Sequence, residues 1–236
     1  MARVRPARRS PPKPPRRRGR PPDTEGRERR CTVALETAAG VFAARGYAGT
    51  EVQEIADLLG VGKASLYRLY PTKKDLFLAT VDRGMERLGD AVDAAAAEAT
   101  TDLERIRLGT LAYLAYFDAH PETVELIVLE RAVFRDRSRP TYFRYRDLRM
   151  VPWQALYRRC VEAGEVRDIP PERFTRVFSD ALYGTIFTNY FAGRRESFEE
   201  QADELLDVLL HGILAESPAP RGGRRRKARR GKDGKR

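Results

Sequence analysis

The spacing of apolar residues is helical along nearly the whole middle of the chain. Apolar side chains recur three and four residues apart, and no segment shows the sustained alternation that marks a half-buried strand. We therefore expect an all-α fold. The predicted helices cover about residues 25–45, 51–59, 63–69, 72–97, 102–119, 122–134, 140–163, 171–192 and 197–215.

Residues that start and stop helices set these boundaries. Gly46 follows the last turn of the first helix as a C-capping glycine does, and Pro71 stops the third helix. Pro152 either kinks the helix over 140–163 or marks its start. Four pairs have the spacing of a capping box, in which each side chain bonds the backbone N–H of the other residue: Thr50 with Gln53, Thr72 with Asp75, Thr101 with Glu104, and Ser197 with Glu200.

The positive charge of the chain is concentrated at its two ends. Residues 1–22 carry nine Arg or Lys residues and no acid, and residues 221–236 carry ten against one acid. Because the net charge is +11 and the ends contribute +18, residues 23–220 carry −7. An acidic folded part with basic, Pro-rich ends suits a polyanion held by flexible arms. We expect disordered arms over 1–23 and 217–236, because so few apolar residues cannot offset chain entropy.

The N-terminal arm contains a short pattern of its own. Arg18, Gly19 and Arg20, followed by Pro21, resemble the core of an AT-hook, an extended segment that lies in a narrow minor groove. A generic polycation that raises affinity without sequence choice explains the same residues equally well. The C-terminal tail lacks the Gly-Arg-Pro core, and we expect it to be nonspecific.

A helix-turn-helix is predicted near the N-terminus. A short helix over 51–59 is followed by the turn Gly60-Val61-Gly62 and a second short helix over 63–69. In this motif the second helix enters the major groove of DNA. The glycines allow a steep angle between the helices, and we expect Val61 to point inward and fill that angle.

The residues around this motif resemble the N-terminal domain of the TetR/AcrR family of bacterial regulators. The resemblance extends over about residues 27–80, beyond which only the helical pattern matches. It implies a DNA-binding domain over 24–80 and a helical ligand-sensing and dimerisation domain over 81–216. It rests on the segments Gly46-Tyr47-Ala48-Gly49-Thr50, Ile55-Ala56, Gly60-Val61-Gly62-Lys63, Leu66-Tyr67 and Tyr70-Pro71-Thr72-Lys73.

The resemblance, together with side-chain chemistry, nominates residues for DNA contact. Thr50, at an expected helix N-terminus, would hold a phosphate. Tyr67 and Lys73 would also hold phosphates, as the resemblance implies. Lys63 and Arg68 have the chemistry to read guanine, while Ala64 and Ser65 are small enough for close approach. Leu69 departs from the histidine often found there, which removes one polar contact.

The second domain is rich in aromatic residues at helical spacing. Such stripes usually form plain core, but the resemblance implies an apolar cavity for an inducer. Candidate lining residues are Tyr113, Phe117, Phe134, Trp153, Tyr157, Tyr183 and Phe187. The resemblance further implies that the helices over 171–192 and 197–215 pair with a second copy, and that ligand binding tilts the helix joining the domains.

We therefore expect a dimeric, ligand-responsive repressor in the cytoplasm that binds palindromic double-stranded DNA without metal or cofactor. Neither an 18-residue apolar run nor a secretory signal is present, and Cys31 and Cys160 form no disulfide framework. Catalytic and phosphate-loop motifs are absent from the sequence, so an enzyme is disfavoured. An activator, a regulator without a ligand, and an architectural protein that coats DNA through its arms remain open.

Overall fold

The computed structural model describes residues 24–193 and 196–212, and within these ranges the chain is all-α with no strand. The two basic arms, including Arg18, Gly19 and Arg20, lie outside the described residues. The described helices are α1 (Thr24–Gly49), α2 (Val52–Leu58), α3 (Lys63–Leu69), α4 (Lys73–Ala97), α5 (Asp102–Ala119), α6 (Pro121–Val133), α7 (Thr141–Glu162), α8 (Pro171–Ala192) and α9 (Phe198–His211).

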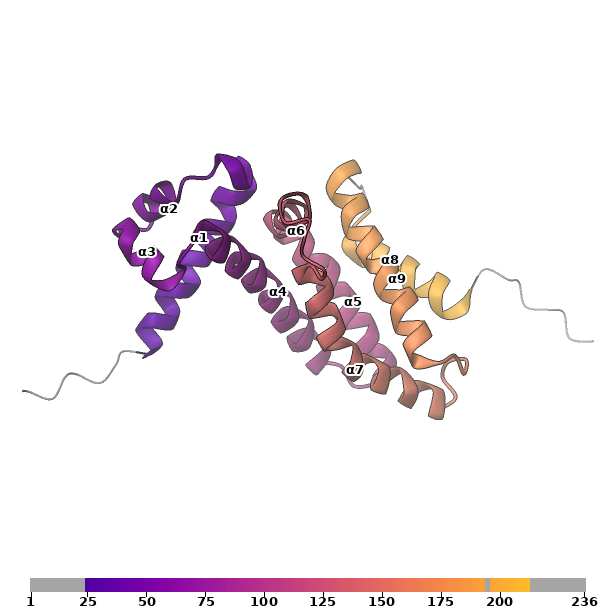
Figure 1. Cartoon of the computed structure of the whole chain (residues 1–236). Helices are drawn as coiled ribbons and strands as arrows, with labels where there is room; N and C mark the ends of the chain where they lie inside the picture. Colours follow the sequence, from indigo (N-terminus) through magenta and orange to yellow (C-terminus); the bar gives the residue numbers. More distant parts are fainter. Residues whose placement is uncertain (1–23, 194–195, 213–236) are drawn as a thin grey trace, which may run out of the picture.

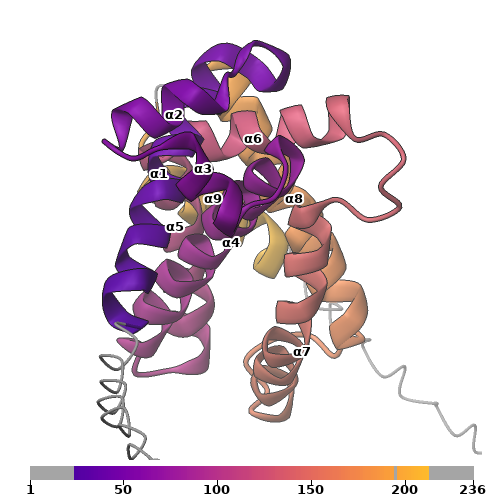
Figure 2. The same cartoon turned by 60° about the vertical axis from the view of Figure 1, so that its left-hand side comes forward.

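The helices form two groups joined by α4. Figure 1 shows α1, α2 and α3 at one end of the molecule and α7, α8 and α9 at the other, with α4 running between them. The turned view in Figure 2 places α6 beside the upper end of α1, and these two helices are indeed in contact. The N-terminal group is therefore held to the rest of the molecule by α6 as well as by α4.

The core of the N-terminal group contains side chains from outside it. Phe42, Ile55 and Phe77 are fully buried there, and Leu126 of α6 belongs to the same apolar cluster. Phe134, directly after α6, lies with its ring 5.0 Å from the ring of Tyr47 and 5.6 Å from that of Phe77. The end of α6 is thus built into the core of the helix-turn-helix group.

Most of the predicted boundaries are confirmed. Every predicted helix is present, and α1 changes direction at Gly46, whose φ of 70° is the left-handed conformation that glycine adopts most readily. Both hydrogen bonds of the capping box form at Thr72 with Asp75 and at Ser197 with Glu200. Pro152 lies inside α7 and does not mark its start.

Two local predictions are wrong and a third is confirmed only in half. Thr50 does not cap α2, because Glu51 occupies the N-cap position of that helix. The buried hydroxyl of Thr50 donates instead to the carbonyl of Gly46 at 2.8 Å. The Thr101 box is half formed, because the carboxylate of Glu104 accepts from Thr100. Val61 points outward and is 40% exposed, since the two glycines beside it already give the turn its shape.

Glu130 of α6 supplies the cap that α7 lacks. The residue before α7 is Pro140, whose side chain cannot accept a hydrogen bond. The carboxylate of Glu130 is buried and accepts from the backbone N–H and the hydroxyl of Thr141 at 3.0–3.1 Å. It also pairs with Arg137 at 3.0 Å. A negative charge at this end of α7 is favoured by the helix dipole as well.

None of the helices in residues 24–193 and 196–212 combines the length and the apolar character that crossing a membrane requires.

We expect Glu130→Ala to lower the free energy of unfolding by about 3 kcal/mol, because Arg137 and the first N–H groups of α7 lose a buried charged partner. Glu130→Gln, which keeps an acceptor oxygen, should lose less. Urea denaturation followed by circular dichroism measures both. Glu162→Ala, at an exposed glutamate of α7, is the control and should stay within about 0.5 kcal/mol of wild type. Equal stability of Glu130→Ala and the control would contradict this role.

Candidate nucleic-acid interface and internal cavity

Helix α3 is anchored by one side chain and presents the others outward. Leu66 is buried against the core of the N-terminal group, while Ala64, Tyr67 and Arg68 are exposed. The guanidinium of Arg68 donates to the hydroxyl of Ser65 at 3.0 Å, on the same side of the helix. A guanidinium has five N–H donors, so this contact leaves others of the exposed Arg68 for an external polar surface.

Lys63 and Lys73 frame this face with positive charge. The ammonium of Lys63 lies 5.9 Å from the ring centre of Tyr67. That of Lys73 lies 4.8 Å from the ring centre of Tyr47 and donates to the carbonyl of Ala48 at 3.2 Å. An ammonium has three donors, so Lys73 keeps two for a further partner.

Two of the nominated residues are less suited to contact DNA. The hydroxyl of Thr50 is buried and already donates within the chain, so the prediction that it holds a phosphate is wrong for this conformation. Leu69 is half-buried at the end of α3. The exposed polar face of α3 therefore consists mainly of Lys63, Ser65, Tyr67 and Arg68.

An apolar cavity of about 130 Å³ lies inside the second group of helices, between α4, α5, α7 and α8. Of the residues nominated from the sequence, Tyr113 and Trp153 line it. Its walls also include side chains that the sequence analysis missed because they read as ordinary core: Met85, Leu88, Val92, Ile106, Phe178 and Leu182.

Trp153 fills part of this cavity by packing on a glycine. A Cβ atom placed on Gly109 would lie 2.5 Å from Cη2 of the indole, so no larger residue fits there with the ring in this position. Pockets for drug-sized ligands measure roughly 300–1,000 Å³. The cavity is smaller than this range, and Trp153 is the large side chain whose displacement would enlarge it.

Two tyrosines that line this cavity, Tyr113 and Tyr142, are hydrogen-bonded to each other. The hydroxyls of Tyr113 and Tyr142 are 2.8 Å apart, and burial raises the pKa of Tyr142 to about 12 and that of Tyr113 well above its usual value. Tyr142 also lines a cleft of about 560 Å³ between α6, the start of α7 and α8. Tyr183 and Phe187, nominated from the sequence, line this cleft instead of the inner cavity.

Three nominated residues line neither the cavity nor the cleft. Phe134 packs in the N-terminal core, as described above, so its assignment to the ligand pocket is wrong. Phe117 is buried against Tyr113 and Tyr116. Tyr157 stacks on Phe174 and its hydroxyl donates to the carbonyl of Arg167 at 2.9 Å. Helical spacing alone does not separate such core aromatics from cavity walls.

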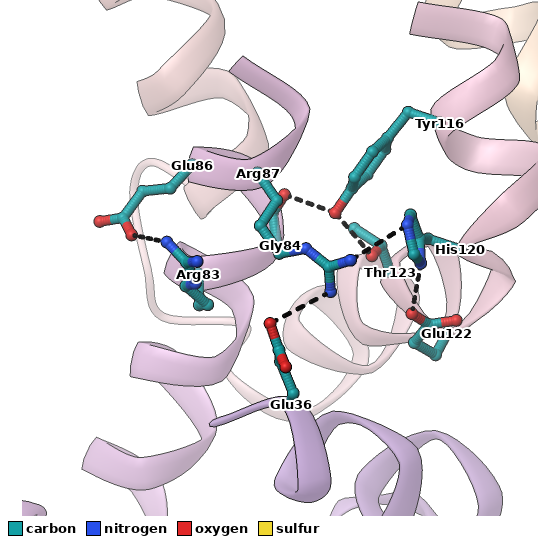
Figure 3. Close-up of polar contacts among 9 residues, drawn as sticks. All are labelled: Glu36, Arg83, Gly84, Glu86, Arg87, Tyr116, His120, Glu122 and Thr123. Atoms are coloured by element: carbon teal, nitrogen blue, oxygen red, sulfur yellow. Dashed lines mark hydrogen bonds and ion pairs between the residues drawn. The ribbon is translucent and has the colours of Figure 1, made fainter. Parts of the chain in front are cut away.

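A polar cluster joins the two groups of helices (Figure 3). Arg87 of α4 lies between Glu36 of α1, at 3.7 Å, and Nε2 of His120, at 3.2 Å. A guanidinium only donates, so Nε2 accepts; Nδ1 then carries the proton and donates to Glu122 at 3.1 Å. The hydroxyl of Tyr116 donates to the carbonyl of Gly84 at 2.8 Å. The cluster ties the corner between α5 and α6 to α4 and α1.

These features define a class: a helix-turn-helix DNA-binding protein whose reading domain is built onto a helical domain with an internal apolar cavity. Residues 34–80 match the family described as bacterial regulatory proteins, tetR family. The KstR2 repressor of Rhodococcus jostii is 28% identical over 82% of this chain and 95% of that protein. The FasR activator of Mycolicibacterium smegmatis is 32% identical, but the match spans 43% of this chain and less than half, 46%, of FasR.

Solved structures of similar regulators have the same fold. The TetR-family regulator PfmR of Thermus thermophilus is 26% identical, with a TM-score of 0.62 over 77% of this chain and 99% of that one. FadR of Bacillus subtilis, solved in complex with stearoyl-CoA, has a TM-score of 0.64 at 16% identity, covers 77% of this chain and 98% of that one, and so shows the fold alone. Residues 34–80 thus match the DNA-binding domain of the tetR family of bacterial regulators, and the described chain as a whole is similar to regulators of that family.

The buried tyrosine pair predicts alkaline destabilisation. An unfolded tyrosine ionises near pH 10, whereas Tyr142 in the folded chain does so near pH 12, so its contribution is full below pH 10 and is lost as the pH rises toward 12. Two pKa units correspond to about 2–3 kcal/mol. We expect the free energy of unfolding, measured in urea between about pH 9 and 11, to fall less steeply in Tyr142→Phe than in wild type.

Tyr67→Phe, at an exposed tyrosine, is the matched control and should keep the wild-type slope. An identical slope in Tyr142→Phe and wild type would show that Tyr142 is not held in the buried environment described here.

Proposed function

We propose that this regulator is a dimeric repressor, which a small apolar or amphipathic effector releases from its DNA. The observation that carries this proposal is that α4 connects the two places: its N-terminus follows the exposed face of α3, and its later turns line the apolar cavity. A movement forced at the cavity would therefore be transmitted along α4 to the DNA-reading face. Such a protein acts in the cytoplasm, where its DNA lies.

For DNA binding, α3 would lie in the major groove. Arg68 has the fork geometry for guanine, and Lys63, at the first turn of the helix, would reach a base edge or a phosphate. Ala64 and Ser65 permit close approach, and Leu69 adds an apolar contact at most. Tyr67 and Lys73 would hold the phosphates on either side, and Arg18, Gly19 and Arg20 would add minor-groove contacts or general affinity.

Similar proteins support an apolar effector. A KstR2 of Mycobacterium tuberculosis is called a ketosteroid regulator, and the FadR structure contains stearoyl-CoA. Tyr113 and Trp153 would contact the effector in the inner cavity. The match to a repressor extends over most of the chain, whereas the match to an activator covers less than half, and this favours repression.

Dimerisation would use the outer faces of α8 and α9. Val177, Phe191 and Val208 are large apolar side chains that are 43–68% exposed on these helices. Gly184 lies on the same side of α8 as Val177 and Phe191 and is also exposed. Two copies joined here would present two α3 helices to successive major grooves, as palindromic sites require.

Gly184→Arg tests this interface without a clash inside one chain, because no heavy atom lies within 4 Å of a Cβ placed there. We expect sedimentation velocity to show a dimer for wild type and a monomer for the variant, with unchanged helicity by circular dichroism. Ala94→Arg, on an exposed face of α4, is the control and should remain a dimer. A dimeric Gly184→Arg would place the interface elsewhere.

DNA reading is tested by fluorescence anisotropy with the intergenic duplex upstream of the gene and a scrambled duplex at equal salt. Wild type should prefer the first by about a thousandfold or more. Arg68→Ala should lose about 1–3 kcal/mol on the specific duplex only, and Tyr67→Ala with Lys73→Ala should weaken both. Arg158→Ala, an exposed arginine of α7, is the control and should bind as wild type does.

A chain lacking residues 1–22 separates this proposal from an architectural protein. Retained preference for the specific duplex supports reading by α3. Equal binding of both duplexes by wild type, abolished by removal of the arm, would overturn the repressor proposal and leave a protein that coats DNA.

A further inference from the structure

The cleft beside the inner cavity has two arginines at its edge that differ from the others nearby. Arg131 and Arg135 line it, and their guanidinium groups donate only to backbone carbonyls, those of Arg135 and Ala132. Among the described residues, neither guanidinium forms an ion pair with a carboxylate. Both side chains belong to exposed residues, so their charge is free to meet a ligand.

The arginines of α7 that face the inner cavity are neutralised. Arg146 pairs with Asp180 at 3.1 Å, and Arg149 pairs with Asp93. Arg144, one turn earlier, pairs with Asp82 in the same way. Positive charge without an acidic partner is therefore found at the cleft and not at the cavity, although arginines are present at both.

The walls of the cleft are apolar and aromatic. Ile127 and Val128 come from α6, Phe143 from α7, and Tyr183 and Phe187 from α8. The two arginines at the edge and this apolar wall together fit a molecule with one anionic end and one apolar body. A simple anion would leave the wall exposed, and a neutral apolar molecule would leave the guanidinium groups unused.

Tyr142 connects the two spaces because it lines both. Its hydroxyl makes a single hydrogen bond, to Tyr113, and leaving a buried hydroxyl unpaired costs about 1–3 kcal/mol. An apolar chain that enters from the cleft would pass Tyr142 on its way to the inner cavity. The inner cavity alone, at about 130 Å³, is smaller than the roughly 300–1,000 Å³ of pockets that hold a drug-sized molecule, and the arginines that line it are already paired.

We propose that the cleft binds the anionic end of an amphipathic effector through Arg131 and Arg135, while its apolar chain passes Tyr142 into the inner cavity. This inference rests on the proposed effector function and adds the chemical class of the ligand. A carboxylate and a phosphate offer the same acceptor geometry to a guanidinium, so either end group satisfies it.

The test uses three probes with one chain length: dodecanoate, dodecyl phosphate and 1-dodecanol, each below its micelle concentration. Isothermal titration calorimetry on the full chain measures affinity. Emission of Trp153, the single tryptophan, reports whether the apolar chain reaches the inner cavity. We expect at least one of the anionic probes to bind about tenfold or more tighter than the alcohol, and to change Trp153 emission. The better of the two identifies the end group.

The double variant Arg131→Gln, Arg135→Gln should lose about tenfold or more in affinity for the anionic probe and bind 1-dodecanol as wild type does. Arg158→Gln, which removes an equal charge elsewhere on the surface, should bind both as wild type does. Equal affinity for alcohol and anions, unchanged in the double variant, would overturn this inference.

The two proposals fail in different ways. If 1-dodecanol and the anions bind equally, change Trp153 emission and release the specific duplex, the effector function stands and the anionic site is wrong. If the anions bind through the two arginines without weakening DNA binding, the site stands and the repressor mechanism is wrong. If no probe binds, the inference is overturned, and the DNA preference measured above still tests the repressor.

Discussion

The packing of the end of α6 into the N-terminal core is the contact on which the arrangement of the two domains depends. Phe134 contributes its ring to a cluster with Tyr47 and Phe77, and Leu126 is buried in the same core. A core packed to this density has few intermediate arrangements, so the end of α6 cannot slide without moving Tyr47. Tyr47 in turn lies under the ammonium of Lys73, at the start of α4. The second group of helices therefore contacts the helix-turn-helix group along α6 as well as along α4.

Polar contacts hold the same junction from the other side. Arg87 lies between Glu36 and His120 on partly exposed surface, where an ion pair contributes at most about 1 kcal/mol. Such contacts set the angle between helices more than they add stability. Glu130 differs, because its carboxylate is buried while it caps α7. If one of its partners were removed, solvent could not take that partner's place. The apolar cluster and this one carboxylate give rigidity, and the exposed polar cluster permits the domains to change their angle at low cost.

The sequence was sufficient to predict the helices, because caps and prolines are local signals: Thr72 with Asp75 and the glycine at 46 act within one turn. The sequence did not predict contacts between side chains that lie far apart along the chain. Phe134 belongs to an aromatic series that favours a ligand pocket, yet its neighbours are in α1 and α4. Thr50 has the spacing of a cap, but the backbone turns at Gly46 and brings a carbonyl to its hydroxyl first. The cavity walls of α4 carry no local signal at all, since Leu88 in a wall and Leu76 in a core have the same pattern.

Under the proposed mechanism, the length of α4 would turn a small change at the cavity into a large one at the DNA. Its 25 residues span about 37 Å, so a tilt of ~5° at the cavity end moves the other end by about 3 Å. Hydrogen bonds to bases are lost over far smaller displacements, because donor and acceptor must stay within about 3.2 Å. Trp153 packs so closely on Gly109 that a Cβ there would lie 2.5 Å from its ring, so an effector that displaces the indole must also shift the helices around it. The coupling is limited only by how much more tightly the effector binds the opened cavity than the closed one, because a ligand with equal affinity for both states shifts neither.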